Sequence, residues 1–366
     1  MTVLINVAAF FFLLGIVVFV HEFGHYIVAV LSGAKVDEFA LGYGRELWGR
    51  VDRRGTRWKI CVLPLGGFCK FFGDSDASSS AADTKKLNSL SPEEKKKCLY
   101  FKNVWQRMAV AAAGPLFNYI LAATLFSAFF MVYGKNIITN RVTKVTPDSP
   151  AYLAGIRDGD RIIEIDGDYM EDFEEIQFKI LLSKSDALKI KVLRDEEELF
   201  FAVSPAIVEQ RNIFNHITKT PQIGIASDDF LHLDAGFFES ISEGVKKTFV
   251  ITKNTLKSLG QMIIGKRGLE DLSGPIKIAQ YSGQALRNGA GAFVFFIAVI
   301  SASLGLANLL PIPILDGGHI FICLLEAIRG KRLGEKAELA LFRAGMGFLT
   351  FLMVFVILKD FIGIFK

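Results

Sequence analysis

The pattern His21-Glu22-Phe23-Gly24-His25 carries the most specific chemistry in this sequence. On a helix, side chains four residues apart project from one face, so His21 and His25 can both reach a single zinc ion. Glu22 points in a different direction and is expected to contact a water molecule instead of the metal, which is the position of a general base. The spacing therefore predicts a zinc site built for hydrolysis.

The pattern lies near the end of a long apolar stretch, and this context strengthens the prediction. Two His and one Glu within a hydrophobic span each cost on the order of 2–3 kcal/mol or more to insert unless they have partners. The alternative, an ordinary surface His and Glu on a soluble helix, does not account for that cost. We therefore expect these groups to share a ligand or a water-filled cavity.

A hydrolytic zinc site needs a third protein ligand and one open position for water. The favoured candidate for this third ligand is Asp316, in the segment NLLPIPILDGGH that runs from Asn308 to His319. The prolines of this segment break the helix and free backbone groups that only a protein-lined or water-lined pocket could satisfy. From the residues alone, His319 stays open as a competing ligand.

Four apolar stretches are long enough to cross a bilayer, at about residues 4–31, 107–133, 290–312 and 341–364. The 366-residue chain is 51% hydrophobic and 22% charged, so polar modules must alternate with membrane spans. We expect a polytopic α-helical membrane protein with about four transmembrane helices. A net charge of +4 over this length makes no obvious basic surface, so no nucleic-acid partner is expected.

Charge places the loops on opposite sides of the predicted membrane. Residues 32–107 contain 15 Lys and Arg against 9 Asp and Glu, and the loop between the last two spans is also basic. The positive-inside rule assigns both segments to the cytoplasm, which leaves residues 134–289 and both termini outside. Within the outer segment, residues 235–264 have helical periodicity interrupted by lysines, which favours an interfacial amphipathic helix over a fifth span.

Residues 141–205 are predicted to form a small β-rich domain, because short strands alternate with tight-turn sequences. The run SPAYLAGIRDGDRIIEIDG resembles a PDZ domain of the bacterial protease type. Four regions are therefore expected: residues 1–140, the N-terminal membrane half; residues 141–205, the PDZ-like domain; residues 206–289, an extracytoplasmic and interfacial segment; and residues 290–366, the C-terminal membrane half.

Several motifs in the same order resemble one known family. HEFGH, then GPLFN at residues 114–118, the PDZ-like insert, SGPI at 273–276 and NLLPIPILDGGH together resemble the site-2 protease family of intramembrane zinc metalloproteases, and within it the branch of the bacterial regulator of sigma-E protease. The resemblance implies that His21, His25 and Asp316 bind zinc, that Glu22 activates water, and that Asn308 helps to hold the substrate or its oxyanion. Some members of this branch carry two PDZ domains, whereas this chain has room for one.

Residues 57–72 alternate apolar and polar side chains before Gly66 and Gly67, which predicts a β-hairpin that turns at these glycines. A purely structural hairpin is one interpretation. The other is that a membrane-associated β-hairpin or sheet dips toward the active site and holds an unwound substrate by strand addition. Such membrane-associated β elements occur in the family that the chain resembles, so Gly66 and Gly67 are candidate substrate-binding residues.

The predicted function is that of an intramembrane zinc metalloendopeptidase in the bacterial inner (cytoplasmic) membrane, with the PDZ-like domain on the extracytoplasmic side. Its expected partners are the lipid bilayer and membrane-anchored protein substrates, cleaved in regulated intramembrane proteolysis, such as anti-sigma factors or signal-peptide remnants. One alternative is a catalytically silent PDZ-bearing membrane scaffold. Another is a soluble-facing metalloprotease anchored by helices, for which only Asp37 and Glu38 could supply a nearby third ligand.

Overall fold

The computed structural model describes residues 2–74, 87, 89–183, 187–211, 217–264 and 274–364. The chain forms two compact units, each considered by itself below. The helical unit comprises Met1–Phe130 and Phe237–Phe365, and the β-rich unit comprises Met131–Gly236. Most of residues 75–88 lies outside the described residues, and helix α3 (Pro92–Lys97) follows this stretch.

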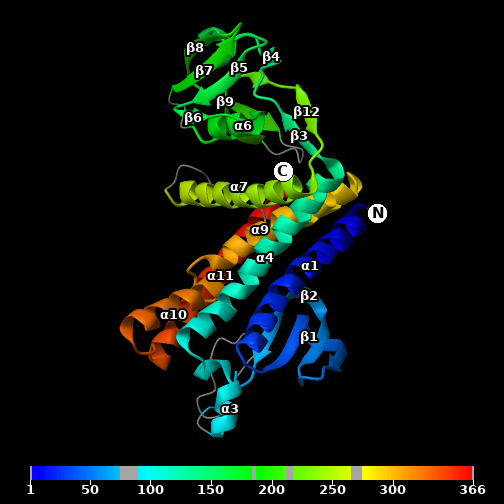
Figure 1. Cartoon of the computed structure of the whole chain (residues 1–366), viewed down its shortest axis with the longest axis vertical. Coiled ribbons are helices and arrows are strands. Elements are labelled where there is room, and N and C mark those ends of the chain that lie inside the picture. The colour runs from blue at the N-terminus through cyan, green and yellow to red at the C-terminus, as the bar shows by residue number, and fades with distance from the viewer. Residues whose placement is uncertain are drawn as a thin grey trace. The chain divides into compact units, whose positions relative to one another are not determined.

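Four helices are long and apolar enough to cross a membrane, as predicted. They are α1 (Thr2–Leu31), α4 (Val104–Tyr133), α9 (Ala290–Leu309) and α11 (Glu335–Ile364) (Figure 1). The structure also describes, in the helical unit, α3, the short 3-10 helix at Leu99–Phe101, α7 (Phe237–Ile263), α8 (Pro275–Arg287) and α10 (Asp316–Arg329).

Helix α9 is packed on both sides by helices from the N-terminal half of the chain. Leu13 and Val17 of α1 are fully buried in a cluster with Phe293 and Ile297 of α9. A second cluster joins α9 to α4, with Phe126 fully buried among alanines of α9. Burying these side chains brings the two halves of the chain into one bundle.

Helix α7 is amphipathic and matches the predicted helix at residues 235–264. It lies across α4 and α9 (Figure 1), with the close approach made at Gly244, where an added Cβ would lie 2.2 Å from Ser127 Oγ. Ser240 and Thr248 are buried on the same face. Exposed large apolar side chains of α7 include Phe238, Ile241, Val245, Phe249 and Leu256, which recur at helical spacing.

Strands β1 (Val36–Val51) and β2 (Arg57–Phe71) follow α1 and bend on themselves. Residues 38–41 pair with 67–70 on one side and with 57–60 on the other, and residues 57–60 pair also with 48–51. The order across this sheet is therefore 48–51, 57–60, 38–41 and 67–70. The two outer segments are its edges.

This register corrects the predicted hairpin within residues 57–72. The chain does bend near Gly66, where φ is +86°, but the two halves of β2 do not pair with each other, because residues 38–41 lie between them. Phe39, in that inserted segment, is 2% exposed and packs against Tyr26 of α1. Burial of Phe39 against α1 gives its segment a central place in the sheet.

The β-rich unit is built around a four-stranded sheet of order β6-β5-β7-β8. Its strands are β5 (Arg161–Ile165), β6 (Asp168–Tyr169), β7 (Leu188–Arg194) and β8 (Glu197–Val203). Three further pairs complete the unit: β3 (Lys135–Ile138) with β12 (Phe230–Leu233), β4 (Lys144–Val145) with β11 (Ile225–Ala226), and β9 (Ala206–Arg211) with β10 (Ile217–Gln222).

Two short helices close the core of the β-rich unit. Helix α5 (Pro150–Ala154) begins at the Ser149 cap and ends at Gly155, whose φ of +99° is the left-handed conformation expected after a helix. Helix α6 (Phe173–Leu181) buries Ile176 against Ile162 and Ile190 of the sheet. The predicted capped helix and the strands that surround it are all present.

A buried ion pair fixes one corner of this unit. The Asp160 side chain is 1% exposed and accepts hydrogen bonds from Arg194 Nε at 2.6 Å and Arg194 Nη2 at 2.8 Å. The backbone N–H of Arg157 donates a third bond to it at 2.8 Å. Removing one partner of such a pair leaves the other charge poorly compensated.

We expect Asp160→Asn to destabilise the β-rich unit by about 3 kcal/mol, because the Arg194 guanidinium loses its counter-charge. Hydrogen exchange of β5 and β7 amides in the full chain measures this loss. The matched control is Glu198→Gln, which removes an exposed partner of Lys191 and should cost under about 1 kcal/mol. Equal protection in the two variants would show that the buried pair adds nothing.

Candidate active site

The site begins with an unusually close contact between α1 and α4. A Cβ added to Gly24 would lie 2.6 Å from Ala113 O, and one added to Gly114 would lie 2.3 Å from His25 Nε2. Only residues without a side chain allow this approach. The two glycines therefore let the histidines of α1 lie directly against the α4 backbone.

The structure brings His21, His25 and Asp316 together. The two Nε2 atoms are 3.2 Å apart, and the Asp316 carboxylate oxygens lie 3.1 Å from His21 Nε2 and 3.4 Å from His25 Nε2. Both histidines are 8% exposed, and one ligand atom from each of the three residues lies within 4.8 Å of the others. Two imidazole nitrogens and one carboxylate oxygen form a donor set that zinc prefers.

Polar groups of α4 orient both imidazoles. His25 Nδ1 lies 2.8 Å from Val110 O, so it donates there and leaves Nε2 free as a ligand. His21 Nδ1 lies 3.1 Å from Asn118 Nδ2, and Asn118 Oδ1 is buried with no hydrogen-bond partner among the described residues. If His21 binds a metal through Nε2, its Nδ1 carries the proton.

That proton assigns the orientation of the Asn118 amide. The oxygen and nitrogen of an amide exchange places by a 180° rotation, which turns Oδ1 toward His21 Nδ1–H and gives the orphaned oxygen its partner. Ser301 Oγ of α9 donates to Asn118 O at 2.8 Å and ties this residue to the next helix. A metal bound to Nε2, on the opposite side of the His21 ring, would therefore explain why the Asn118 oxygen otherwise lacks a hydrogen-bond partner.

Asp316 reaches the cluster because it begins α10 after a break in the helix. Leu315 N donates to Ile312 O at 2.9 Å and closes a turn over the prolines. A Cβ added to Gly317 would lie 2.3 Å from both Leu309 O and Leu310 O, so the chain folds back tightly onto the end of α9. His319, the alternative ligand, lies outside the cluster, and its ring centroid is 5.2 Å from that of Phe342.

Glu22 lies beside the predicted substrate-binding glycines. A Cβ added to Gly67 would lie 3.0 Å from Glu22 Cγ and 2.9 Å from Val18 Cγ1, so the sheet edge contacts α1 at this point. Tyr43 Oη donates to Gly67 O at 3.0 Å, and its ring lies against Gly66. The structure therefore places Gly67 against the Glu22 side chain, and Gly66 against the Tyr43 ring.

Asn308 lies in the last turn of α9 and is partly buried. Within the described residues, no hydrogen bond joins its side chain to His21, His25 or Asp316. Sequence reasoning gave no role to Asn118, which the structure brings into the site. The signal available for it was an amide in the middle of an apolar span, where an unpartnered polar group is costly.

Comparison with known proteins decides the family. The model of Peptidase family M50 matches residues 9–352. The chain belongs to this family. A protein of Agrobacterium fabrum named "Putative zinc metalloprotease Atu1380" is 38% identical over 97% of this chain and 95% of its own length. Metalloprotease MmpA of Caulobacter vibrioides is 30% identical over 98% of this chain and 95% of its own. This M50 protein is a zinc-dependent metalloprotease, as the motifs predicted.

Solved structures of PDZ domains are similar to part of the M50 chain. The PDZ domain of the SdrC-like protein from Listeria innocua is 29% identical, with a TM-score of 0.22, and matches 26% of this chain and 99% of that one. The HtrA3 PDZ domain bound to a phage-derived ligand is 26% identical, with a TM-score of 0.18, over 20% of this chain and 80% of that one.

We expect Gly114→Ala to lower zinc affinity by at least about 10-fold, because the new methyl group would displace the His25 imidazole. Alanine favours a helix more than glycine does, so a loss cannot be assigned to a weakened α4. Metal analysis of the purified chain measures the effect. Gly15→Ala in α1, where an added Cβ meets nothing within 4 Å, is the matched control and should bind zinc normally.

Proposed function

We propose that this M50 metalloprotease cleaves peptide bonds in the transmembrane segments of membrane-anchored proteins. The observation that carries the proposal is the position of the His21, His25 and Asp316 cluster. It is assembled from α1, the end of a helix apolar enough to span a membrane, and from α10, which follows another such helix. A substrate must therefore present its bond to helices that are themselves embedded in lipid.

His21, His25 and Asp316 would hold the zinc ion. Zinc, when bound, supplies a Lewis acid for the scissile carbonyl and lowers the pKa of water. Glu22 is partly buried beside this cluster and has no hydrogen-bond partner among the described residues, so its carboxylate is free to act. We assign it to accept a proton from the attacking water and to return that proton to the leaving amine.

The edge of the β1–β2 sheet supports binding of an extended substrate. Among the described residues, 67–70 pair only with 38–41, which leaves this edge without a second strand partner and supports strand addition there. Gly67 in this edge lies against Glu22, which would bring an added strand to the general base. Asn308, at the end of α9, is assigned to the substrate or its oxyanion, as the family resemblance implies.

The basic loops support an orientation with β1–β2 at the cytoplasmic face of a bacterial inner membrane and the β-rich unit outside. The exposed apolar stripe of α7 supports an interfacial position for that helix. Fitting substrates are membrane proteins already shortened on the outer side, such as anti-sigma factors or signal-peptide remnants in regulated intramembrane proteolysis.

A catalytically silent scaffold is the weaker alternative, because Glu22 and all three ligand side chains are present and the ligands are assembled. A helix-anchored protease whose third ligand follows the HExxH pattern directly is also disfavoured. Asp37 pairs with Lys35 and Glu38 pairs with Lys59, and neither belongs to the cluster.

We expect Glu22→Gln to keep about one zinc per chain and to lower peptidase activity by about 10²–10⁴-fold, since it removes the general base but no ligand. Cleavage of a single-span substrate in detergent, with parallel metal analysis, measures both quantities. Asp316→Asn is the companion variant and should lose zinc together with activity. Near-normal cleavage by Glu22→Gln would refute the assignment of the base.

We propose that the β-rich unit, whose sheet and short helices resemble a PDZ domain, acts as a size filter outside the membrane. Every catalytic residue proposed above lies in the helical unit, so the β-rich unit can be removed without touching the site. Ile138 and Phe230 are direct partners in the β3–β12 pair. A short Asn-Gly turn can therefore replace residues 139–229 and close the hairpin.

This deletion should leave zinc bound, keep cleavage of an ectodomain-trimmed substrate, and newly permit cleavage of the full-length one. The physical reason is steric: a folded outer unit excludes bulky ectodomains before a bond can reach the site. The assay compares both substrates with wild-type and deleted enzyme. Loss of cleavage of the trimmed substrate, with zinc retained, would instead indicate that the unit is required for docking.

A further inference from the structure

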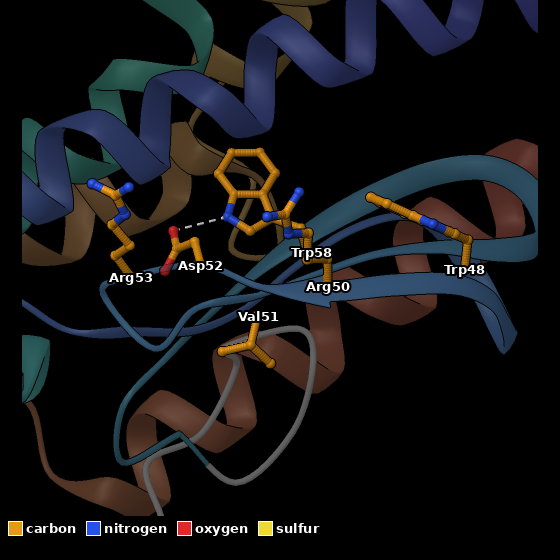
Figure 2. Close-up of a pocket in the computed structure, with 6 residues that line it drawn as sticks. All are labelled: Trp48, Arg50, Val51, Asp52, Arg53 and Trp58. Atoms are coloured by element: carbon orange, nitrogen blue, oxygen red, sulfur yellow. Dashed lines mark hydrogen bonds between the residues drawn. The ribbon is translucent and has the colours of Figure 1, made fainter.

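A groove at the turn of the β1–β2 sheet has no part in the proposed peptidase chemistry. It is open, has a volume of about 390 Å³, and is lined by Trp48, Arg50, Val51, Asp52, Arg53 and Trp58 (Figure 2). It lies at the edge formed by residues 48–51, opposite the edge that carries Gly67. The side chains of Asp52, Arg53 and Trp58 lie on the side of the strand toward α1.

The Asp52 carboxylate is fully used in shaping the groove. It accepts hydrogen bonds from Trp58 Nε1 at 3.0 Å, Tyr26 Oη at 3.1 Å, and the backbone N–H groups of Arg54 and Thr56 at 2.8 and 3.0 Å. Burial acts to raise the pKa of Asp52, but these hydrogen bonds outweigh it and hold the pKa below its usual value. These bonds hold the turn in place, and the ionised Asp52 oxygens are directed at these four donors and not at a guanidinium of Arg50 or Arg53.

The two arginines of the groove form no ion pair within the described residues. Arg50 and Arg53 are exposed, and in the described part of the chain neither pairs with a carboxylate. By contrast, Arg57 on the adjacent segment pairs with Glu46, and Lys59 pairs with Glu38. A pair of free guanidinium groups in a preformed groove suits the oxygens of a phosphate.

The groove also lies where a bilayer surface would be. Trp58 packs on Tyr26 of α1, with ring centroids 5.0 Å apart, five residues before α1 ends at Leu31. Trp48 and its cross-strand partner Ile60 are 56% and 45% exposed on the same sheet. Membrane proteins typically expose apolar side chains at the depth of the acyl chains, then tryptophan, and then arginine at the depth of the headgroups.

We propose that this groove binds the headgroup of an anionic phospholipid of the membrane that α1 crosses. Arg50 and Arg53 contact the phosphate, and the exposed ring of Trp48 lies against the glycerol and the start of the acyl chains. A bound lipid would hold one edge of the sheet at the membrane surface while the opposite edge lies beside Glu22. The inference rests on α1 spanning the bilayer, and it does not depend on catalysis.

The test uses tryptophan fluorescence of the full chain in vesicles. The chain has three tryptophans, so Trp105→Phe leaves only Trp48 and Trp58 as reporters. Phosphatidylglycerol and phosphatidylcholine, each brominated near the headgroup end of the acyl chains, are compared as quenchers at equal mole fraction. We expect stronger quenching by the anionic lipid, and a preference that falls about fivefold for each arginine lost in Arg50→Gln and Arg53→Gln.

Arg45→Gln is the matched control, because Arg45 is an exposed arginine of the same sheet outside the groove, and it should keep the preference. Equal quenching by the two lipids, or a preference that survives loss of both arginines, would overturn the proposal. So would abolition of the preference by inorganic phosphate at constant ionic strength, which would indicate a site for free phosphate. If the double glutamine variant loses its circular dichroism, Arg50→Lys with Arg53→Lys must retain the preference.

Discussion

The placement of ionisable side chains among apolar helices is the constraint on which the helical unit depends. His21, His25 and Asp316 are nearly buried, and each would be costly in hydrocarbon if it had no partner. They lower this cost by meeting one another and the polar backbone of α4. The close contact at Gly24 and Gly114 is therefore a requirement of the site as much as of helix packing.

The same constraint explains how the rest of the unit is arranged. Asp316 can enter the cluster only because α9 ends and α10 begins beside it, with Gly317 packed on the carbonyls that the break exposes. Asn118 orients His21 and is itself tied to α9 by Ser301. The sheet that follows α1 supplies Gly67 next to Glu22. The candidate zinc ligands, the groups that orient them and the edge of the β1–β2 sheet therefore come from segments that are distant in sequence.

Much of the fold and of the candidate zinc site could be predicted from local sequence patterns. Long apolar stretches identify the four candidate spans because a bilayer requires about 20 apolar residues in a row. The HExxH spacing places both histidines on one face because the helical repeat is 3.6 residues. Turn and cap signals around Ser149 and Gly155 located the short helix of the β-rich unit. Each of these inferences depends on neighbours along the chain.

Local sequence patterns identified the candidate spans, the histidine pair with its glutamate, and Asp316 and His319 as possible third ligands. The choice between these two ligands came from the fold, because packing places the His319 ring near Phe342 and outside the cluster. It also decided that residues 38–41 separate the halves of β2 and that Asn118 meets His21. Strand register and helix contacts depend on side chains far apart in the chain, and no local periodicity encodes which of them will meet.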